Sequence, residues 1–481
     1  MAETPQLDDS APAPPQVPPR LRVHPLLWIL LAGVVVRGLL LIWFAGEPLH
    51  PGDELDYDEL AVHLVAQGQF VLEGQTCSMR PPLYPAFVAA VYACCGLANY
   101  QAVRALQAAL ALATVALVYF LGRRLYGRRV GLWAAGLYCF YPSMLGQANL
   151  LMSETLFTFW LVLACLVVAR SLERESIGWL GAAGVVIGLA ALTRSVLWLF
   201  PPVLALYVLV AWKTGFRRRL AAACLMVAAF AATIAPWSIR CSRLEGTFVA
   251  IDVMGGRNFM MGNYEHTPLE RMWDVISIPD APGAEVKPWY RVLAGENPGF
   301  RELTQGQRDK LAMRRGVRFV LENPGVTLRR DVVKFFNFWQ LERSLVAGMG
   351  RGWFGDLPLC AVLPLTALIF GAYAAAMIAG IFGAAMAPAA DRRLWWLLLL
   401  VIVYVCGLHT LVFAHSRYHL PLVPLVLIFA SAAVVYRREI WRRRRTRPFW
   451  IAAALSLVLA GGWAWEILAV DLQRFMKILK P

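Results

Sequence analysis

Long apolar runs alternate with short polar segments along most of the 481-residue chain. Eleven runs are long enough to cross about 30 Å of hydrocarbon as helices. The predicted spans are 25–45, 101–121, 129–146, 151–169, 177–193, 195–212, 219–238, 358–384, 394–413, 418–436 and 449–468. This pattern predicts an all-α polytopic membrane protein, in which the spans hold most of the hydrophobic residues.

Two long polar segments, 46–100 and 239–357, interrupt the series of spans and are predicted to lie on the outer side. The first is expected to contain a short helix over 54–67 and a surface helix over 83–97, which at about 15 residues is too short to span. The predicted units are a disordered cytoplasmic tail (1–24), an N-terminal transmembrane module (25–238, including the first loop), a large outer loop (239–357), C-terminal transmembrane helices (358–468) and an outer tail (469–481).

The charge distribution supports this topology. The net charge is +15, which would suit nucleic acid, but Lys and Arg gather in four short loops at alternate span ends. These loops are 123–129, 213–219, 391–393 and 437–447. With eleven spans and the N-terminus inside, all four fall in the cytoplasm, as the positive-inside rule requires. We therefore expect no nucleic acid partner and a multi-pass membrane protein.

The first outer loop carries a dense acidic segment directly after the first span. Asp53, Glu54, Asp56, Asp58 and Glu59 fall within seven residues. Charge beside a membrane is costly unless it faces water or a functional cavity, which indicates a site on the outer side. The alternative is helix capping, because acids in a first turn stabilise the helix dipole.

Three more charged residues lie at predicted outer ends of spans. Glu154 follows Ser153 at the start of a span, where it is either functional or a helix cap. Arg194 and Arg417 lie on the side that the positive-inside rule disfavours for cations. They are either phosphate ligands or anchors that reach to the interface, and arginine suits phosphate because it binds two oxygens at once.

These features occur in an order that resembles the GT-C superfamily of membrane glycosyltransferases. The similar families are bacterial relatives of protein O-mannosyltransferases and lipid A aminoarabinose transferases. The resemblance rests on Asp53–Glu54 with Tyr57, followed by RPPLYP (80–85), NLLMSET (149–155), GLAALTR (188–194) and HSRYHLPLVP (415–424). It extends over nearly the whole chain, although each motif alone is weak.

The resemblance implies a protein of the bacterial cytoplasmic membrane that transfers a sugar from a polyprenyl-phosphate donor to an acceptor hydroxyl at the outer face of that membrane, with inversion. The acceptor is a glycolipid, a glycan or a protein, and membrane lipids surround the enzyme. A divalent cation is left open because relatives differ in its use. The resemblance gives Asp53 the catalytic role of general base, with Glu54 positioning it or helping to bind a metal. Arg80, Arg194 and Arg417 are candidate substrate-binding residues for the donor phosphate. Tyr57, His415 and Tyr418 are further substrate-binding candidates, with structural packing as the alternative for Tyr57 and His415, and Asp53 and Glu154 could hold the metal.

Two other classes remain as alternatives. A transporter or flippase of lipid-linked sugars would show paired repeats and charges near the midplane of the membrane. An O-antigen ligase or polymerase would also have a large outer loop, but the early acidic segment does not suit it. Cys77 and Cys241 are expected on the outer side, where a disulfide between them is left undecided.

Overall fold

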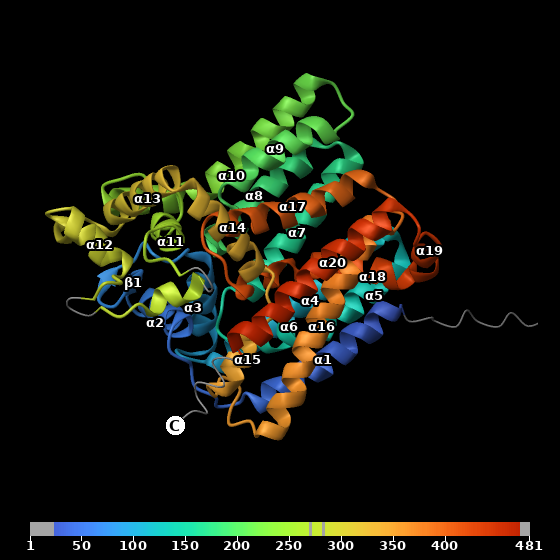
Figure 1. The fold of residues 1–481 in the computed structure, drawn as a ribbon, viewed down its shortest axis with the longest axis horizontal. Coiled ribbons are helices and arrows are strands. Elements are labelled where there is room, and N and C mark those ends of the chain that lie inside the picture. The colour runs from blue at the N-terminus through green and yellow to red at the C-terminus, as the bar shows by residue number, and fades with distance from the viewer. Residues whose placement is uncertain (1–23, 269–271, 281–283, 472–481) are drawn as a thin grey trace, which may run out of the picture.

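The computed structural model describes residues 24–268, 272–280 and 284–471. The predicted cytoplasmic tail (1–24) falls outside this part of the chain except for its last residue, as do 472–481 of the predicted outer tail. Figure 1 shows a slanted bundle of long helices with a group of shorter helices at one end. The short antiparallel hairpin β1 (Val71–Leu72) and β2 (Gln75–Thr76) belongs to that group.

Within the described residues, eight helices are long and apolar enough to cross a membrane. They are α1 (Pro25–Trp43), α4 (Tyr100–Tyr126), α7 (Glu154–Arg174), α10 (Phe216–Glu245), α16 (Leu359–Met386), α17 (Arg392–Leu411), the continuous stretch of η4 (Ser416–Leu422) and α18 (Val423–Val435), and α20 (Arg447–Trp465), which continues into η5 (Glu466–Asp471). The prediction of an all-α polytopic membrane protein is confirmed.

The three other predicted spans correspond to helices that are shorter than these eight. Two of them are the shorter apolar helices α8 (Ile177–Thr193) and α9 (Phe200–Ala211). The predicted span 129–146 is not one helix but two, α5 (Arg128–Cys139) and α6 (Pro142–Gln147). Proline lacks a backbone N–H and disfavours helical backbone in the residue before it, so Pro142 starts a new helix rather than continuing α5.

Close packing joins the helices of the bundle. Gly184 of α8 meets the backbone of α10 at Met226, and Gly383 of α16 meets the backbone of α18 at Phe429, so neither position has room for a Cβ atom. Small residues of this kind let membrane helices approach closely where no hydrophobic effect drives them together. One continuous core therefore extends through α4, α5, α7, α8 and α18.

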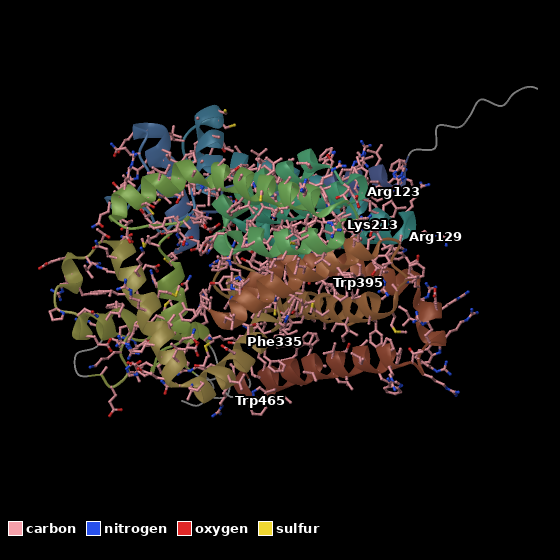
Figure 2. All side chains as sticks on the ribbon, turned by 90° about the horizontal axis from the view of Figure 1, so that it is seen from above. Arg123, Arg129, Lys213, Phe335, Trp395 and Trp465 are labelled. Atoms are coloured by element: carbon pink, nitrogen blue, oxygen red, sulfur yellow. The ribbon has the colours of Figure 1, made fainter. Side chains whose placement is uncertain are left out.

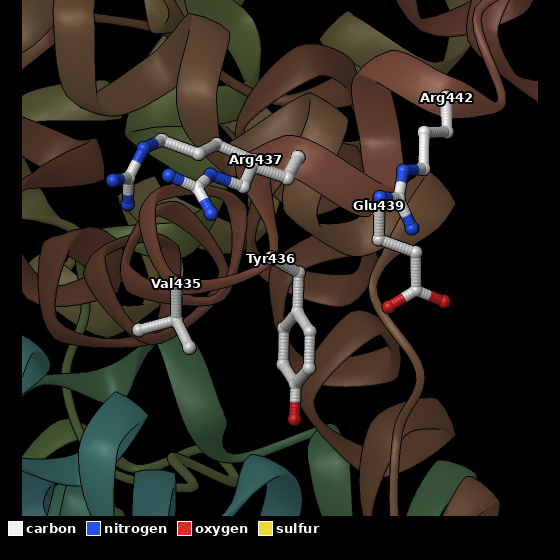
Figure 3. Close-up of a pocket in the computed structure, with 6 residues that line it drawn as sticks. Val435, Tyr436, Arg437, Glu439 and Arg442 are labelled. Atoms are coloured by element: carbon white, nitrogen blue, oxygen red, sulfur yellow. The ribbon is translucent and has the colours of Figure 1, made fainter.

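Basic loops gather at one end of the bundle, where Figure 2 labels Arg123, Arg129 and Lys213. The backbone N–H of Lys213 donates to Glu175 at 2.8 Å, and Arg393 lies 3.6 Å from the same carboxylate. A cavity of about 710 Å³ also lies here, beside α19 (Arg437–Arg442). Figure 3 shows its lining, which is Val435, Tyr436, Arg437, Arg438, Glu439 and Arg442. The four basic loops thus share one end, as their predicted common side requires.

The opposite end carries the two long polar segments. The first forms α2 (Asp53–Gln67) and α3 (Leu83–Cys95), which pack together around Tyr57 and Tyr84. The second forms α11 (Gly255–Gly262), η2 (Met272–Ser277), α12 (Trp289–Glu296), η3 (Phe300–Glu302), α13 (Gln305–Glu322), α14 (Pro324–Phe338) and α15 (Arg343–Gly350). Cys77 and Cys241 are both buried and free in this structure.

Candidate active site

The acidic segment forms the first turn of α2. Gly52 precedes the helix with a φ of 113°, a backbone conformation that residues with a Cβ rarely adopt. This turn places Asp53 at the first helical position. A carboxylate there is stabilised by the helix dipole, so the local sequence both starts the helix and fixes the acid at its end.

Three other segments bring their charged residues to the same point. Glu154 is the first residue of α7 and is only 1% exposed. Arg194 ends α8 in an extended conformation, just before η1 (Ser195–Leu197). Arg417 lies in η4, where its N–H donates to Nδ1 of His415 at 3.1 Å. Each residue therefore sits at a helix end, where the chain leaves the bundle.

Arg417 joins the two main carboxylates. Its Nη1 donates to Oδ2 of Asp53 at 2.7 Å, and its Nε donates to Oε1 of Glu154. Arg194 Nη1 also donates to Oε1 of Glu154, at 2.7 Å. Arg80 Nη2 donates to Oδ1 of Asp53 at 2.7 Å, and its Nε donates to Asp56 at 3.2 Å. Three carboxylates and three guanidinium groups thus form one chain, which we call the charge cluster.

The charge cluster shifts the protonation of its members. Burial alone would raise the pKa of Asp53, but Arg417 and Arg80 outweigh it and hold this pKa well below its usual range. Burial would lower the pKa of Arg80, and its acidic neighbours instead raise it. Opposite charges at such distances favour the ionised forms. Asp53 is therefore an ionised carboxylate, with a low affinity for protons as long as both arginines stay in place.

Two tyrosines border the charge cluster. Tyr57 donates to Oγ of Ser153 at 3.4 Å, and the Arg80 guanidinium lies 5.5 Å from the centre of its ring. The Arg194 guanidinium lies 5.8 Å from the ring of Tyr418. Cations over aromatic faces are stabilised by the ring quadrupole. The structure thus brings both predicted tyrosines to the predicted arginines.

Glu54 has different contacts, although it is adjacent to Asp53 in sequence. Its Oε1 accepts from the backbone N–H of Leu151 at 2.6 Å, and its Oε2 accepts from the N–H of His50 at 2.9 Å. The side chain is 1% exposed. Glu54 therefore ties the start of α2 to the segment before α7, and it reaches Asp53 only through the backbone.

The two histidines near Arg417 have separate surroundings. His415 packs on Trp273, with ring centres 4.3 Å apart. His419 is buried away from the charge cluster, where its Nδ1 bonds to the carbonyl of Phe338 at 2.6 Å and its Nε2 lies 3.6 Å from Glu342. His415 thus lies next to Arg417, whereas His419 joins η4 to the outer helices.

Residues 79–239 match the family model described as dolichyl-phosphate-mannose-protein mannosyltransferase. The predicted resemblance to GT-C membrane glycosyltransferases is confirmed. A solved oligosaccharyltransferase from Archaeoglobus fulgidus, in complex with Zn and sulfate, is similar in fold, with 15% identity and a TM-score of 0.50 over 90% of this chain and 53% of its own. The chain therefore spans about half the length of that enzyme.

ArnT from Cupriavidus metallidurans, solved bound to undecaprenyl phosphate, also aligns with the chain. The identity is 15% and the TM-score 0.38, over 86% of this chain and 78% of ArnT. No curated protein matches the sequence at a significant level.

The predicted metal site can be tested against the donors that are present. Both oxygens of Asp53 accept from arginines, and Oε1 of Glu154 accepts from two. Among the described residues, no group of three His, Cys, Asp or Glu side chains is close enough to share an ion. Divalent cations need several oxygen ligands. The arrangement seen here does not fit a metal, and we derive no step through one.

Asp252 is a residue of the site region that the sequence analysis missed. It lies between α10 and α11, and its carboxylate accepts from the N–H of Met254 at 3.1 Å. Burial raises its pKa to about 6, while Ser195, the neighbour of Arg194, opposes this shift by a hydrogen bond. The signal was present in the sequence, since Asp252 is a lone acid in the apolar run 248–254.

His409 of α17 was also missed. Its ring stacks on Tyr418 at 4.5 Å, with an interplanar angle of 17°. Its Nδ1 bonds to the carbonyl of Phe413 at 3.1 Å, so the ring is fixed from both sides. His409 therefore orients the tyrosine that faces Arg194.

Proposed function

We propose that the protein is a glycosyltransferase that moves a sugar from a polyprenyl-phosphate donor to an acceptor hydroxyl at the outer face of the cytoplasmic membrane. The observation that carries this proposal is the bridge that Arg417 makes between Asp53 and Glu154. The description of the matching family names dolichyl-phosphate-mannose, a donor of this chemical class.

The orientation follows from the two ends of the bundle. The basic loops at one end are expected in the cytoplasm, because cytoplasmic loops carry an excess of Lys and Arg. Asp53 lies at the other end, at the start of α2. The charge cluster then faces the outside of the cell, at the level where a donor headgroup would emerge from the bilayer.

Arg194 and Arg417 would bind the donor phosphate. Arginine forms paired hydrogen bonds with phosphate oxygens and stays charged in poorly hydrated sites. Both side chains are held by the buried carboxylate of Glu154, so little side-chain entropy is lost when the donor binds. Glu154 is thus a positioning residue for the arginines in this proposal.

The same phosphate would activate Asp53. When Arg417 turns toward the phosphate, Asp53 loses its strongest stabilising partner and its pKa rises. A carboxylate with a higher proton affinity is a better general base. The donor would therefore create the base that its own transfer requires, and Glu54 would keep the start of α2 in place.

The transfer itself can be written as one displacement. The acceptor oxygen attacks the anomeric carbon as its proton passes to Asp53. The bond from that carbon to the phosphate oxygen breaks, and the electron pair leaves with the polyprenyl phosphate. Arg194 and Arg417 stabilise the charge that develops there, which is the usual role of fixed cations in group transfer. Attack opposite the leaving group inverts the configuration.

A charged residue within a span is typical of transporters, but here helix packing explains the charge that is present. Arg37 of α1 is buried, and its Nη1 donates to the carbonyls of Cys139 at 3.1 Å and Gly33 at 3.4 Å. It therefore joins α1 to the end of α5. The charged residues of the candidate site lie at helix ends instead, which favours an enzyme.

A comparison of two neighbouring acids tests the proposal. The purified protein, reconstituted with a panel of polyprenyl-phosphate sugars, should release free polyprenyl phosphate when acceptor is present. Asp53→Asn should lose about 10²-fold or more of this turnover while it still binds donor. Asp56→Asn is the matched control, because Asp56 also pairs with Arg80 but does not contact Arg417. Full turnover by Asp53→Asn would contradict the role of Asp53 as base.

A further inference from the structure

A cavity of about 450 Å³ lies among the outer helices, next to the charge cluster. None of the residues that line it belongs to that cluster. Its walls come from α11, η2, α12, η3 and the start of α13. Met79, the neighbour of Arg80 in the sequence, also lines it. The N–H of Val253 donates to the carbonyl of Ser78 at 3.1 Å, which holds the two walls together at this point. The volume is in the range of small-molecule sites.

Part of the lining of the cavity is apolar. Trp289 and Pro288 at the start of α12 lie there with Met254, Met261 and Phe300. Trp289 is partly exposed, and the Arg257 guanidinium lies 5.4 Å from the centre of its ring. An aromatic ring in this position can pack against a flat apolar surface of a ligand.

The polar side of the cavity holds both donors and acceptors that lack partners. Nε of Arg257 and Oε1 of Gln305 are buried and make no hydrogen bond to the described part of the protein. Asp309 accepts from the N–H of Arg257 at 2.8 Å, but its carboxylate makes no ion pair in that part of the chain. Buried polar groups without partners are rare and costly, so a ligand that reaches them after a small rotation of the two side chains would be stabilised.

Burial affects the pKa values of Asp309 and Arg257 more strongly than neighbouring charges do. It raises the pKa of Asp309 and lowers the pKa of Arg257, which the nearby Arg80 lowers further. Both groups are thus poorly compensated in the protein alone. Neutral hydrogen-bonding partners would stabilise both charged groups.

These features distinguish between classes of ligand. A phosphate or a carboxylate would suit Arg257 and Arg308, but it only accepts hydrogen bonds and would also meet the carboxylate of Asp309. A lipid tail would leave Nε of Arg257 and Oε1 of Gln305 without partners. A sugar hydroxyl both donates and accepts, as such a mixed set requires. A sugar ring also presents C–H groups on one face, which suit Trp289.

We infer that this cavity binds a saccharide, and that the saccharide is the acceptor. The inference rests on the proposed function, and it narrows the acceptor from a glycolipid, a glycan or a protein to a molecule that presents a sugar ring. The cavity lies beside Arg80, which pairs with Asp53, so a bound ring would have its hydroxyls near the general base.

Saturation-transfer NMR tests the inference without any knowledge of the donor. The purified protein in nanodiscs is mixed with a panel of methyl glycosides of the gluco, galacto, manno, N-acetylgluco and arabino types. At least one should receive magnetisation from the protein. Trp289→Leu and Gln305→Met should each weaken this binding about 2- to 10-fold. Trp441→Leu, an exposed tryptophan of α19 at the basic end, is the matched control and should bind as the wild type does.

Two outcomes overturn the inference. One is the absence of transfer to every glycoside of the panel, and the other is transfer that both cavity variants retain in full. Binding of undecaprenyl phosphate, measured on the same samples, separates this result from the proposed function. If the lipid binds and the glycosides do not, the acceptor inference fails alone; if the glycosides bind and the lipid does not, the donor assignment fails instead.

Discussion

Nη1 of Arg417 lies 2.7 Å from Oδ2 of Asp53, although the two residues are 364 positions apart in the sequence. This contact joins the first outer loop to the segment before α18, and Glu154 on the same guanidinium adds α7. A cation between a buried carboxylate and a half-buried one is held firmly, and in the proposed function a donor phosphate would replace one of these pairings.

Loss of Arg417 should destabilise the protein. Arg417→Gln leaves Glu154 with one cation and Asp53 with one, and the hydrogen bonds to charged groups that it removes are each worth about 1.5–3 kcal/mol. The melting temperature in detergent should fall clearly. The double variant Arg417→Gln/Glu154→Gln should recover much of this loss without recovering donor binding. A loss of stability in the double variant equal to the sum of the two single losses would show that the pair is not coupled.

The pH dependence of turnover should differ between the free and the donor-bound enzyme. The rate needs ionised Asp53, so it falls as the pH falls through the pKa of this residue. In the free enzyme Arg417 and Arg80 hold that pKa low, and bound phosphate should raise it. The acid limb of kcat, which reports the complex, should therefore lie at higher pH than the acid limb of kcat/KM, which reports the free enzyme. Coincident limbs would contradict the exchange of Arg417.

Asp252 should make the folded protein less stable as the pH rises. Its pKa rises from 3.8 to about 6 in the folded protein, so the folded state binds the proton more tightly than the unfolded chain does. Wild-type stability should thus fall as the pH rises from about 4 to 6, and the cost should persist above that range. Asp252→Asn should be more stable than the wild type by about 1–3 kcal/mol at pH 8 and similar to it at pH 4. Melting temperatures over this range would show it, and an equal difference at every pH would refute it.

Arg104 should be needed for folding rather than for chemistry. Its guanidinium donates to the carbonyls of Asn149, Phe44 and Glu47 at 2.9–3.1 Å, and the residue is 2% exposed. Arg104→Gln should lower stability by about 1–3 kcal/mol, because it leaves buried carbonyls without donors. Arg124→Gln, which removes an exposed pair with Glu173, should cost less than about 1 kcal/mol. Equal losses in thermal melts would mean that Arg104 does not hold the first loop.

The sequence predicted much of the charge cluster because its members break simple rules. Arg194 and Arg417 are cations on the side that the positive-inside rule disfavours, and Glu154 is a carboxylate at the start of an apolar run. Each exception required a local explanation, and the structure brings all three together. Their spacing along the chain gave no pairing, because such contacts depend on how the spans pack.

Other features depend on geometry that composition does not reveal. Neighbouring residues of a helix point about 100° apart, so Asp53 and Glu54 cannot both face one site. The sequence gives no reason to choose between them before the packing of α2 is known. The division of 129–146 at Pro142 and the burial of Asp252 are likewise decided by local backbone and by neighbours distant in sequence.

Binding of undecaprenyl phosphate to the intact protein tests the central claim most directly. Native mass spectrometry with phosphatidylglycerol as competitor would measure it for the wild type, for Arg194→Gln and for the control Arg170→Gln, whose side chain pairs with Glu173 near the basic end. Arg194→Gln keeps the Arg417 bridge, so the site should stay folded while it loses one phosphate ligand. We predict that Arg194→Gln binds the lipid about 10- to 100-fold more weakly and that the control binds as the wild type does. Equal binding by all three proteins would contradict the account.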